Sequence, residues 1–322
     1  MINRETAFSR AFEEQKANSN RKNAEYNKAL QALKAKNIRI DEIDRTLKAV
    51  GAKIGLTVLS GDKNELDRMQ KLITALSDER QAILEKNGIA PPKFDCNACK
   101  DTGYIDGKIC NCIKSRAKQI LIEELSKSLP LNSCRFDNFS LKYYSDEDSE
   151  NGNPRKRMEG ILKLCRDYAK DFSPRSSESI LFMGNAGLGK THLSLSIVYE
   201  LLNQGFDVVY GSAYNLFAAM ENDQFGNRSN DSFNAAVSCD LLVIDDLGSE
   251  FVSPYIQAMF YNVVNTRLLS NRPTIINTNL TMQEIEQKYT PRISSRFIGN
   301  YTAKKFIGND IRQIKIAEKL KG

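Results

Sequence analysis

Residues 184–191 combine the amino acids and the spacing needed to hold a nucleoside triphosphate. They read Gly-Asn-Ala-Gly-Leu-Gly-Lys-Thr and fit the pattern G-x-x-x-x-G-K-[ST]. Glycines let the backbone curl so that successive amide N–H groups face one anion. Lys190 can reach the β- and γ-phosphates, and the Thr191 hydroxyl can ligate Mg²⁺. The predicted nucleotide-binding residues here are Gly184, Asn185, Ala186, Gly187, Leu188, Gly189, Lys190, Thr191 and His192.

The segments on either side supply the strand and the helix that such a loop needs. Residues 179–183, Ser-Ile-Leu-Phe-Met, predict a buried strand. Residues 192–202 place leucine, isoleucine and valine at helical spacing, and Gly205 is a typical stop after such a helix. Both flanks therefore favour a nucleotide site over a glycine-rich turn that carries Lys-Thr by coincidence.

A second group of candidate residues is the acidic pair Asp245-Asp246, which follows four apolar residues at 241–244. A buried parallel strand is a continuous apolar run, and its carboxyl end delivers side chains to the crevice where ligands bind. Asp245 is predicted to hold Mg²⁺, directly or through water, and Asp246 to orient or activate the attacking water. The pair lies 54 residues after Thr191, in a pattern of alternating helix and strand that indicates one parallel sheet.

A third strand, predicted at 273–279, also ends in polar residues. Asn279 can hydrogen-bond the γ-phosphate or the attacking water from the neighbouring strand end. Alternatively, Asn279 belongs to a loop that leads into a helix, because Thr281 and Glu284 form a capping box. The two interpretations are compatible, since Thr281 can cap while Asn279 contacts the nucleotide.

Three arginines downstream are candidates for stabilising charge on a transferring phosphoryl group: Arg292, Arg296 and Arg312. Arginine suits that task in the same subunit or from a neighbouring one. Isolated arginines are more often surface residues. Their position after the loop, the acidic pair and the polar strand end favours the functional interpretation.

Cys96, Cys99, Cys110 and Cys112 form two closely spaced thiol pairs around a short turn-rich loop. This arrangement suits a tetrahedral Cys₄ zinc site, although the C-x-C spacing of the second pair is tighter than the usual C-x₂-C. Free thiols and redox chemistry are the alternatives. The other three cysteines, Cys134, Cys165 and Cys239, are isolated in sequence and are predicted to be ordinary small apolar residues.

The N-terminal part is rich in helix-favouring residues. The strongest signal begins at Asp62, where Asp62 and Glu65 predict an N-terminal cap, and stops at Asn87-Gly88. An earlier, more polar helix is predicted through Phe8 and Leu33. This part is either a small helical hairpin or an arm that docks on a partner protein.

Length and charge narrow the class of protein. With 322 residues the chain has room for two domains, and its net charge is +6. Residues 1–140 carry 25 Lys+Arg and 19 Asp+Glu, whereas the remainder carries 21 of each. The basic excess favours contact with nucleic acid or an acidic partner, or it is an ordinary solvated surface. No apolar run reaches the roughly 18 residues that span a membrane, and no export signal is evident, so a cytoplasmic protein without membrane contact is expected.

Taken in order, these motifs resemble those of an AAA+ ATPase. Their details are similar to the DnaC/DnaI-type bacterial replicative helicase loaders and their IstB-like relatives. The matching details are Gly-Lys-Thr-His-Leu at 189–193, Asp-Asp-Leu-Gly at 245–248, Thr-Asn-Leu at 278–280, Arg-Ile-Ser-Ser-Arg-Phe at 292–297 and Gly-Asn-Asp-Ile-Arg at 308–312. Residues 135–139 and the cysteine module also resemble parts of such loaders. The resemblance covers about 95–322, and residues 1–94 match only in being helical.

The resemblance implies roles for the arginines and a path for DNA. Arg296 would be an arginine finger acting across a subunit interface in a homo-oligomer, with Arg292 in support, and Arg312 would be a second sensor in the same subunit. Strand 208–210 and helix 213–221 would line a path for single-stranded DNA. The candidate DNA contacts there, by stacking and hydrogen bonding, are Tyr210, Ser212 and Tyr214.

The fold class predicted is α/β: a P-loop AAA+ domain with a central parallel sheet, preceded by a helical N-terminal region and a small zinc-binding module. The expected divisions are a helical arm at 1–92, the zinc module at 93–116, a linker leading into the ATPase at 117–150, and the ATPase domain at 151–322.

The implied function is ATP-dependent loading of a hexameric replicative helicase onto single-stranded DNA, with ATP/ADP, Mg²⁺ and Zn²⁺ as cofactors. Many AAA+ proteins have Glu where this chain has Asp246, and the shorter acid favours slow, switch-like hydrolysis. The alternatives are an IstB-like transposition helper ATPase and a non-hydrolysing, nucleotide-dependent adaptor.

Overall fold

The structure, a computed structural model, describes residues 4–60, 62–131, 133–148, 150, 152–225 and 230–321. The chain forms two compact units. We call Arg10–Ile113 the arm unit, and Met1–Ser9 together with Lys114–Gly322 the sheet unit. The arm unit thus includes both the N-terminal helices and the four clustered cysteines. The finer four-part division expected from the sequence stays a prediction.

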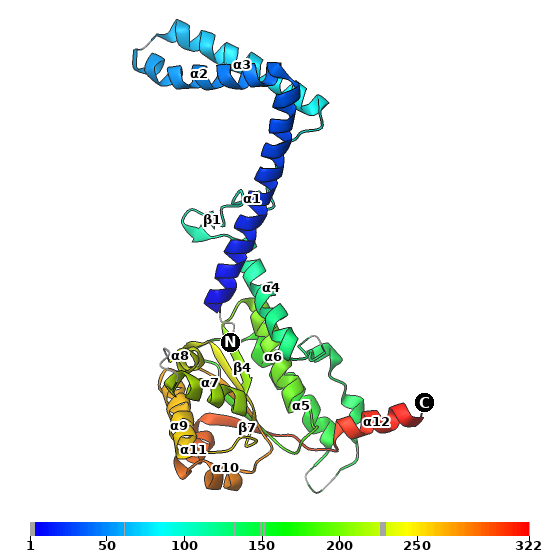
Figure 1. Ribbon diagram of the computed structural model, residues 1–322. Coiled ribbons are helices and arrows are strands. Elements are labelled where there is room, and N and C mark those ends of the chain that lie inside the picture. The colour runs from blue at the N-terminus through cyan, green and yellow to red at the C-terminus, as the bar shows by residue number, and fades with distance from the viewer. Residues whose placement is uncertain are drawn as a thin grey trace. The chain divides into compact units, whose positions relative to one another are not determined.

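Three helices account for most of the arm unit: α1 (Arg4–Lys36), α2 (Ile38–Ser60) and α3 (Lys63–Lys86). The last two run side by side as a hairpin (Figure 1). The Asp62 carboxylate accepts a hydrogen bond from the Glu65 backbone N–H, and Asn87 is the C-terminal cap, so the predicted ends of α3 are confirmed. Asp44 on α2 pairs with Lys34 on α1 at 2.5 Å and with Arg80 on α3 at 2.6 Å.

The rest of the arm unit is a loop with a two-stranded antiparallel ribbon, β1 (Tyr104–Ile105) and β2 (Lys108–Ile109). Helix α4 (Asn111–Ser128) follows directly, so Cys112 lies in its first turn. Helix α4 ends two residues before Pro130, which cannot continue a helix.

The sheet unit is built on five parallel strands in the order β4-β5-β6-β3-β7. They are β3 (Ser179–Met183), β4 (Val208–Ser212), β5 (Leu241–Leu247), β6 (Thr274–Thr278) and β7 (Tyr301–Lys305). The α/β class is confirmed, and so are the strands predicted around 179–183, 208–210, 241–244 and 273–279. The edge strand β7 escapes sequence reasoning because only Tyr301 of its residues, Tyr-Thr-Ala-Lys-Lys, is buried and the strand ends in charge.

Helices cover both faces of this sheet (Figure 1). One face packs on α5 (Pro154–Lys170) and α6 (Lys190–Gln204), joined by residues such as Ile161, Leu195 and Phe182. The other face packs on a larger set of helices: α7 (Ala213–Phe225), α8 (Asp231–Ser238), α9 (Pro254–Leu269), α10 (Met282–Lys288) and α11 (Pro291–Asn300). Two 3₁₀ turns, η1 (Phe136–Asn138) and η2 (Leu141–Tyr143), precede the sheet, and α12 (Ile311–Lys321) follows it.

The polar loop before α5 ends at Asn153, and the helix begins at Pro154. The Asn153 side chain accepts a hydrogen bond from the Lys156 N–H, and proline is well suited to the first helical position. Ser149 and Asn151 of this loop lie outside the described residues. Within the described chain, none of the helices is long and apolar enough to cross a membrane.

Candidate nucleotide and metal sites

The loop at residues 184–189 connects β3 to α6, as the sequence predicts, and is tightly enclosed. Gly189 caps α6 in the left-handed region at φ 91°, and α6 itself starts at Lys190. Gly187 has φ 75°, and a Cβ placed there would lie 1.9 Å from the Asp310 Oδ1 atom. The Ile311 N–H also donates to the Gly187 carbonyl at 3.1 Å. The tip of the loop therefore needs glycine, and it contacts the segment that begins α12.

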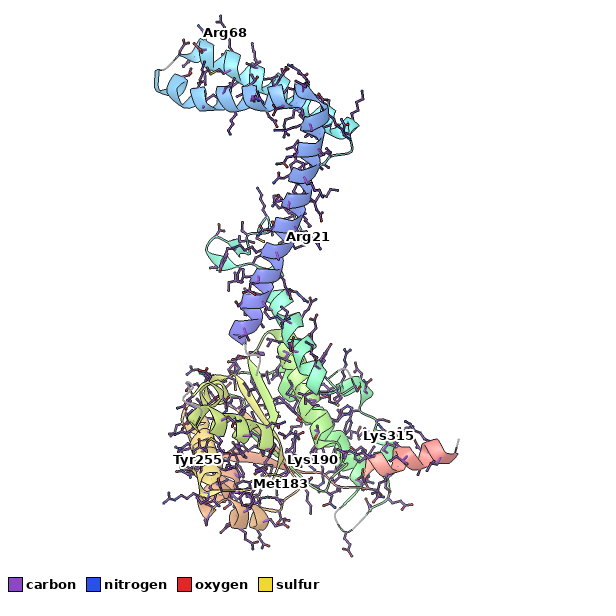
Figure 2. The ribbon with its side chains drawn as sticks, viewed as in Figure 1. Arg21, Arg68, Met183, Lys190, Tyr255 and Lys315 are labelled. Carbon is purple, nitrogen blue, oxygen red and sulfur yellow. The ribbon has the colours of Figure 1, made fainter. Side chains whose placement is uncertain are left out.

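Lys190 lies in the sheet unit, at the first residue of α6 (Figure 2). Its ammonium donates to the carbonyls of Gly184 at 2.6 Å and Asn185 at 2.7 Å, and to the Asn279 Oδ1 atom at 2.7 Å. Burial lowers the pKa of Lys190 to about 8, even though nearby carboxylates act in the opposite direction. A partly desolvated cation beside a loop of backbone N–H groups is suited to bind phosphate.

A β-bulge delivers the acidic pair to the same edge of the sheet. Ile244 pairs with Ile276 and Leu247 pairs with Thr278, so Asp245 and Asp246 together oppose the single residue Asn277. Asp246 is the extra residue of the bulge, and its backbone lies in the left-handed region at φ 53°. Strained, bulged positions of this kind are common beside functional sites. Both carboxylates consequently line one cavity with the phosphate loop.

Asp245 is held by donors from three elements. The Thr191 hydroxyl lies 3.1 Å from its Oδ1 atom and 3.0 Å from Oδ2. The Tyr210 hydroxyl donates to Oδ2 at 2.6 Å, and the Asn277 amide donates to Oδ1 at 2.6 Å. A carboxylate beside a threonine hydroxyl is a hard-oxygen pair that fits Mg²⁺, so the residues present suit this metal.

Asn279 connects the lysine to the second acid. Its Oδ1 atom accepts from Lys190, while its amide donates to the Asp246 Oδ1 atom at 3.3 Å. The capping box of Thr281 and Glu284 is also present at the start of α10. The capping box predicted from the sequence is therefore confirmed, while the contact of Asn279 with the nucleotide stays a prediction.

The cavity at this edge has a volume of about 550 Å³ and is lined by more than the predicted motifs. Sequence reasoning missed a set of residues before the sheet and on α12: Pro130, Cys134, Asn138, Phe139, Ser140, Tyr143, Ile311 and Lys315. The Tyr144 hydroxyl donates to the Leu188 carbonyl at 2.9 Å, which fastens this preceding segment to the loop. The aromatic residues at 139–144 could have indicated that this segment packs against the protein, but the local sequence does not identify the phosphate loop as the surface that they contact.

The arginines fall into two groups. Arg312 lines the cavity with the loop and the acidic pair. Arg296 does not line it: its guanidinium lies 4.3 Å from the centre of the Tyr261 ring and donates to the Asn265 Oδ1 atom at 2.8 Å. Arg292 is exposed on α11. The structure therefore brings Arg312 to the site within this chain and leaves Arg292 and Arg296 outside it.

The suggested DNA contacts need one correction. Tyr210 is only 8% exposed and its hydroxyl is bonded to Asp245, so it cannot stack on a base. Tyr214, by contrast, is 63% exposed at the start of α7. The sequence suggested that Tyr210 lies at an exposed strand end, whereas in the structure it is buried and its hydroxyl donates to Asp245.

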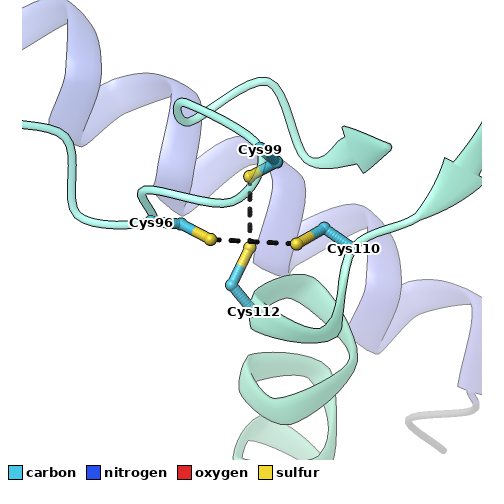
Figure 3. A group of neighbouring side chains, drawn as sticks. All are labelled: Cys96, Cys99, Cys110 and Cys112. Carbon is cyan, nitrogen blue, oxygen red and sulfur yellow. Dashed lines mark hydrogen bonds between the residues drawn. The ribbon is translucent and has the colours of Figure 1, made fainter. Parts of the chain in front are cut away.

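The four clustered cysteines converge in the arm unit (Figure 3). Their sulfur atoms all lie within 4.8 Å of one another, with Cys96 to Cys110 at 3.8 Å and Cys99 to Cys112 at 3.6 Å. Four thiolates at the usual zinc–sulfur distance of ~2.3 Å would be ~3.8 Å apart in a tetrahedron. The geometry therefore fits a Cys₄ zinc site.

Hydrogen bonds within the cluster favour a thiolate at Cys99, whereas burial and the neighbouring thiols raise the pKa of Cys112 to about 12. Burial opposes ionisation of Cys99, but hydrogen bonds from the Gly103 backbone and from neighbouring thiols lower its pKa to about 6. The Gln15 amide lies 3.9 Å from the Cys99 sulfur and 3.8 Å from the Cys112 sulfur. Amide donors of this kind orient and stabilise the ligands of a metal from outside its coordination sphere.

Comparison with known proteins finds a family match within the sheet unit: residues 167–294 match the family of IstB-like ATP binding proteins. Over 155 residues the chain is 33% identical to the replicative helicase loader DnaC of Escherichia coli strain K12, covering 46% of this chain and 62% of that protein. It is 28% identical over 173 residues to the DnaC loader of Buchnera aphidicola from Acyrthosiphon pisum, covering 52% and 65%. The chain thus spans less than two thirds of the length of these relatives.

Solved structures give weaker matches. The crystal structure of the DnaC helicase loader is 16% identical, covers 55% of this chain and 99% of that one, and has a TM-score of 0.47. The DnaI crystal structure is 22% identical, covers 53% and 92%, and has a TM-score of 0.42. Because both scores are below 0.5, the assignment of a family depends on the sequence matches.

Proposed function

We propose that this chain is a DnaC-type AAA+ ATPase that loads a replicative helicase in an ATP-dependent manner, a proposal that its sequence matches support. The observation that carries the proposal is the meeting of Lys190, Asp245, Asp246 and Asn279 at one sheet edge. Three strands that are separate in sequence deliver a phosphate cradle, a metal ligand and a polar bridge to one cavity.

The chain's own residues would divide the work of ATP binding and hydrolysis. The backbone N–H groups of residues 184–189 and the Lys190 ammonium bind the phosphates, replacing the carbonyl contacts that Lys190 now makes. Thr191 and Asp245 would hold Mg²⁺, which would neutralise charge on the phosphates. Asp246 orients the attacking water and takes its proton. Asn279 holds Asp246 and Lys190 in place through one hydrogen bond to each.

The position of Arg296 supports a role between subunits. Its guanidinium is oriented by Asn265 and the Tyr261 ring, and Arg296 does not line the cavity of its own chain. An arginine positioned in this way can reach the nucleotide of a second copy of the chain and stabilise the transferring phosphoryl group. We therefore propose a homo-oligomer in which Arg296 acts in trans, Arg292 supports it, and Arg312 senses the nucleotide in cis.

Hydrolysis is proposed to be slow, so that it acts as a switch. Asp246 carries one methylene less than the glutamate common at this position, and its carboxylate shares a hydrogen bond with Asn279. ATP binding would promote assembly on single-stranded DNA, and hydrolysis would release the helicase. The arm unit, with zinc at its four cysteines, would bind the hexameric helicase.

The test of this proposal uses the full chain with its metal retained. Immobilised protein is incubated with lysate in the presence of ATP, and the retained proteins are identified. Recovery of a hexameric replicative helicase is expected, with less recovery for the Cys99→Ser variant. Recovery of a transposase instead would support the IstB-like helper. ATP turnover that is the same in wild type and in Lys190→Ala would leave only a non-hydrolysing adaptor.

A further inference from the structure

We propose that Tyr210 is a positioning residue for Asp245 and sets the affinity of the nucleotide site for its divalent cation. This inference rests on the proposed function, because it assigns Asp245 to the metal. Tyr210 comes from β4, the strand next to β5, and takes no direct part in the predicted chemistry. Its hydroxyl is nevertheless the donor to Asp245 Oδ2, at 2.6 Å.

The first step is the count of acceptor positions on Asp245. A carboxylate offers about four lone-pair positions, two on each oxygen. Asn277 uses one on Oδ1 and Tyr210 uses one on Oδ2. The Thr191 Oγ1 atom lies 3.1 Å from Oδ1 and 3.0 Å from Oδ2, so its single proton can satisfy one of the two oxygens. A lone-pair position on the Thr191 side is therefore not used by these three donors, and a cation shared by Thr191 and Asp245 would occupy that side.

The second step is rigidity. Tyr210 is 8% exposed, and its ring packs in the core between the sheet and α6. Asn277 is 1% exposed and also donates to the Ser194 hydroxyl at 2.8 Å. Neither donor can follow the carboxylate if it rotates. The two strands that flank β5 therefore fix the Asp245 carboxylate from opposite sides before a metal arrives, and hydrogen bonds of this kind tune the affinity of a ligand for its metal.

The substitution that tests this role is Tyr210→Phe, which keeps the buried ring and removes only the donor. The matched control is Tyr168→Phe: Tyr168 packs against the same core, and its hydroxyl donates to the Glu178 carbonyl at 3.0 Å, away from Asp245. Mn²⁺ serves as the probe, because free Mn²⁺ gives an electron paramagnetic resonance signal that disappears on binding. Each protein is saturated with ADP and titrated with Mn²⁺, and ADP affinity is measured separately in EDTA.

Tyr210→Phe is expected to weaken Mn²⁺ binding about tenfold and to leave ADP affinity in EDTA within about twofold of wild type. Tyr168→Phe is expected to match wild type in both measurements. Unchanged Mn²⁺ affinity in Tyr210→Phe would overturn the inference, and so would an equal loss of ADP affinity in EDTA, which would indicate a packing role. If the wild type bound no ADP at all, the proposed function itself would fail, which is a distinguishable result.

Discussion

The nucleotide site of the sheet unit draws on residues from Pro130 to Lys315, whereas the cysteine site of the arm unit lies within residues 96–112. The first is positioned by a parallel sheet with a large core on both faces. The second lies in a loop whose ribbon exposes Tyr104 and Ile105 to solvent and whose buried members are mainly cysteines. We therefore expect the sheet unit to fold before it binds a ligand, and the cysteine loop to need a bound metal for its order.

The largest expected effect comes from removing one thiol. Cys99→Ser should reduce zinc from about one equivalent to a small fraction, because structural zinc binding contributes about 10–16 kcal/mol and needs all four ligands. The same variant should become sensitive to proteolysis near residues 93–113. Metal analysis and limited proteolysis measure these effects. Cys165→Ala, which changes a buried thiol of the sheet unit, is the control and should keep its zinc.

Lys190→Ala tests the nucleotide site of the sheet unit. The loss of the phosphate-binding ammonium should lower ATP turnover by roughly a hundredfold or more, since one preorganised electrostatic contact is commonly worth that much. The zinc content should not change. Lys163→Ala, on the exposed side of α5, is the control for loss of a lysine. A variant that lost zinc together with turnover would contradict the independence of the two sites.

A glycine pair distinguishes close packing from backbone strain within the sheet unit. In Gly205→Ala the added Cβ has no packing contact within 4 Å, so the only cost is the left-handed backbone conformation. This variant should lose about 1 kcal/mol of unfolding free energy. Gly187→Ala adds the close contact with Asp310 and should cost more, with a clear loss of ADP affinity. Denaturant unfolding and ADP titration measure the two effects. Equal behaviour of the two variants would mean that the loop tip and α12 are not packed as described.

The smallest predicted effect is a pH dependence of nucleotide binding. The pKa of Lys190 is lowered to about 8, so the unliganded lysine loses its proton above that pH, whereas bound phosphate favours the ammonium. Affinity for ADP should be flat below pH 7 and fall by up to about tenfold per unit above pH 8. Lys190→Arg, which stays protonated, should show no such fall. A fall of the same steepness in that variant would assign the titration to another group.

The two sites also differ in how far the sequence predicts them. The phosphate loop, the acidic pair and the four cysteines are contiguous or regularly spaced, so residue types alone suggest the chemistry. Tyr210 and Asn277 are different, because only the order of the strands places them on either side of Asp245. The aromatic segment at 139–144 reaches the loop through tertiary packing, which no local pattern encodes. Strand β7 was missed because solvated lysines at a sheet edge hide the pattern of a buried strand.

The most direct test of the central claim is the loading reaction itself. Purified hexameric helicase is mixed with circular single-stranded DNA, and DNA-bound helicase is counted with and without this protein and ATP. Wild type with ATP is predicted to raise the amount of DNA-bound helicase, and Lys190→Ala is predicted to leave it at the level without loader. An equal amount of bound helicase with wild type, with Lys190→Ala and with no loader would contradict the account.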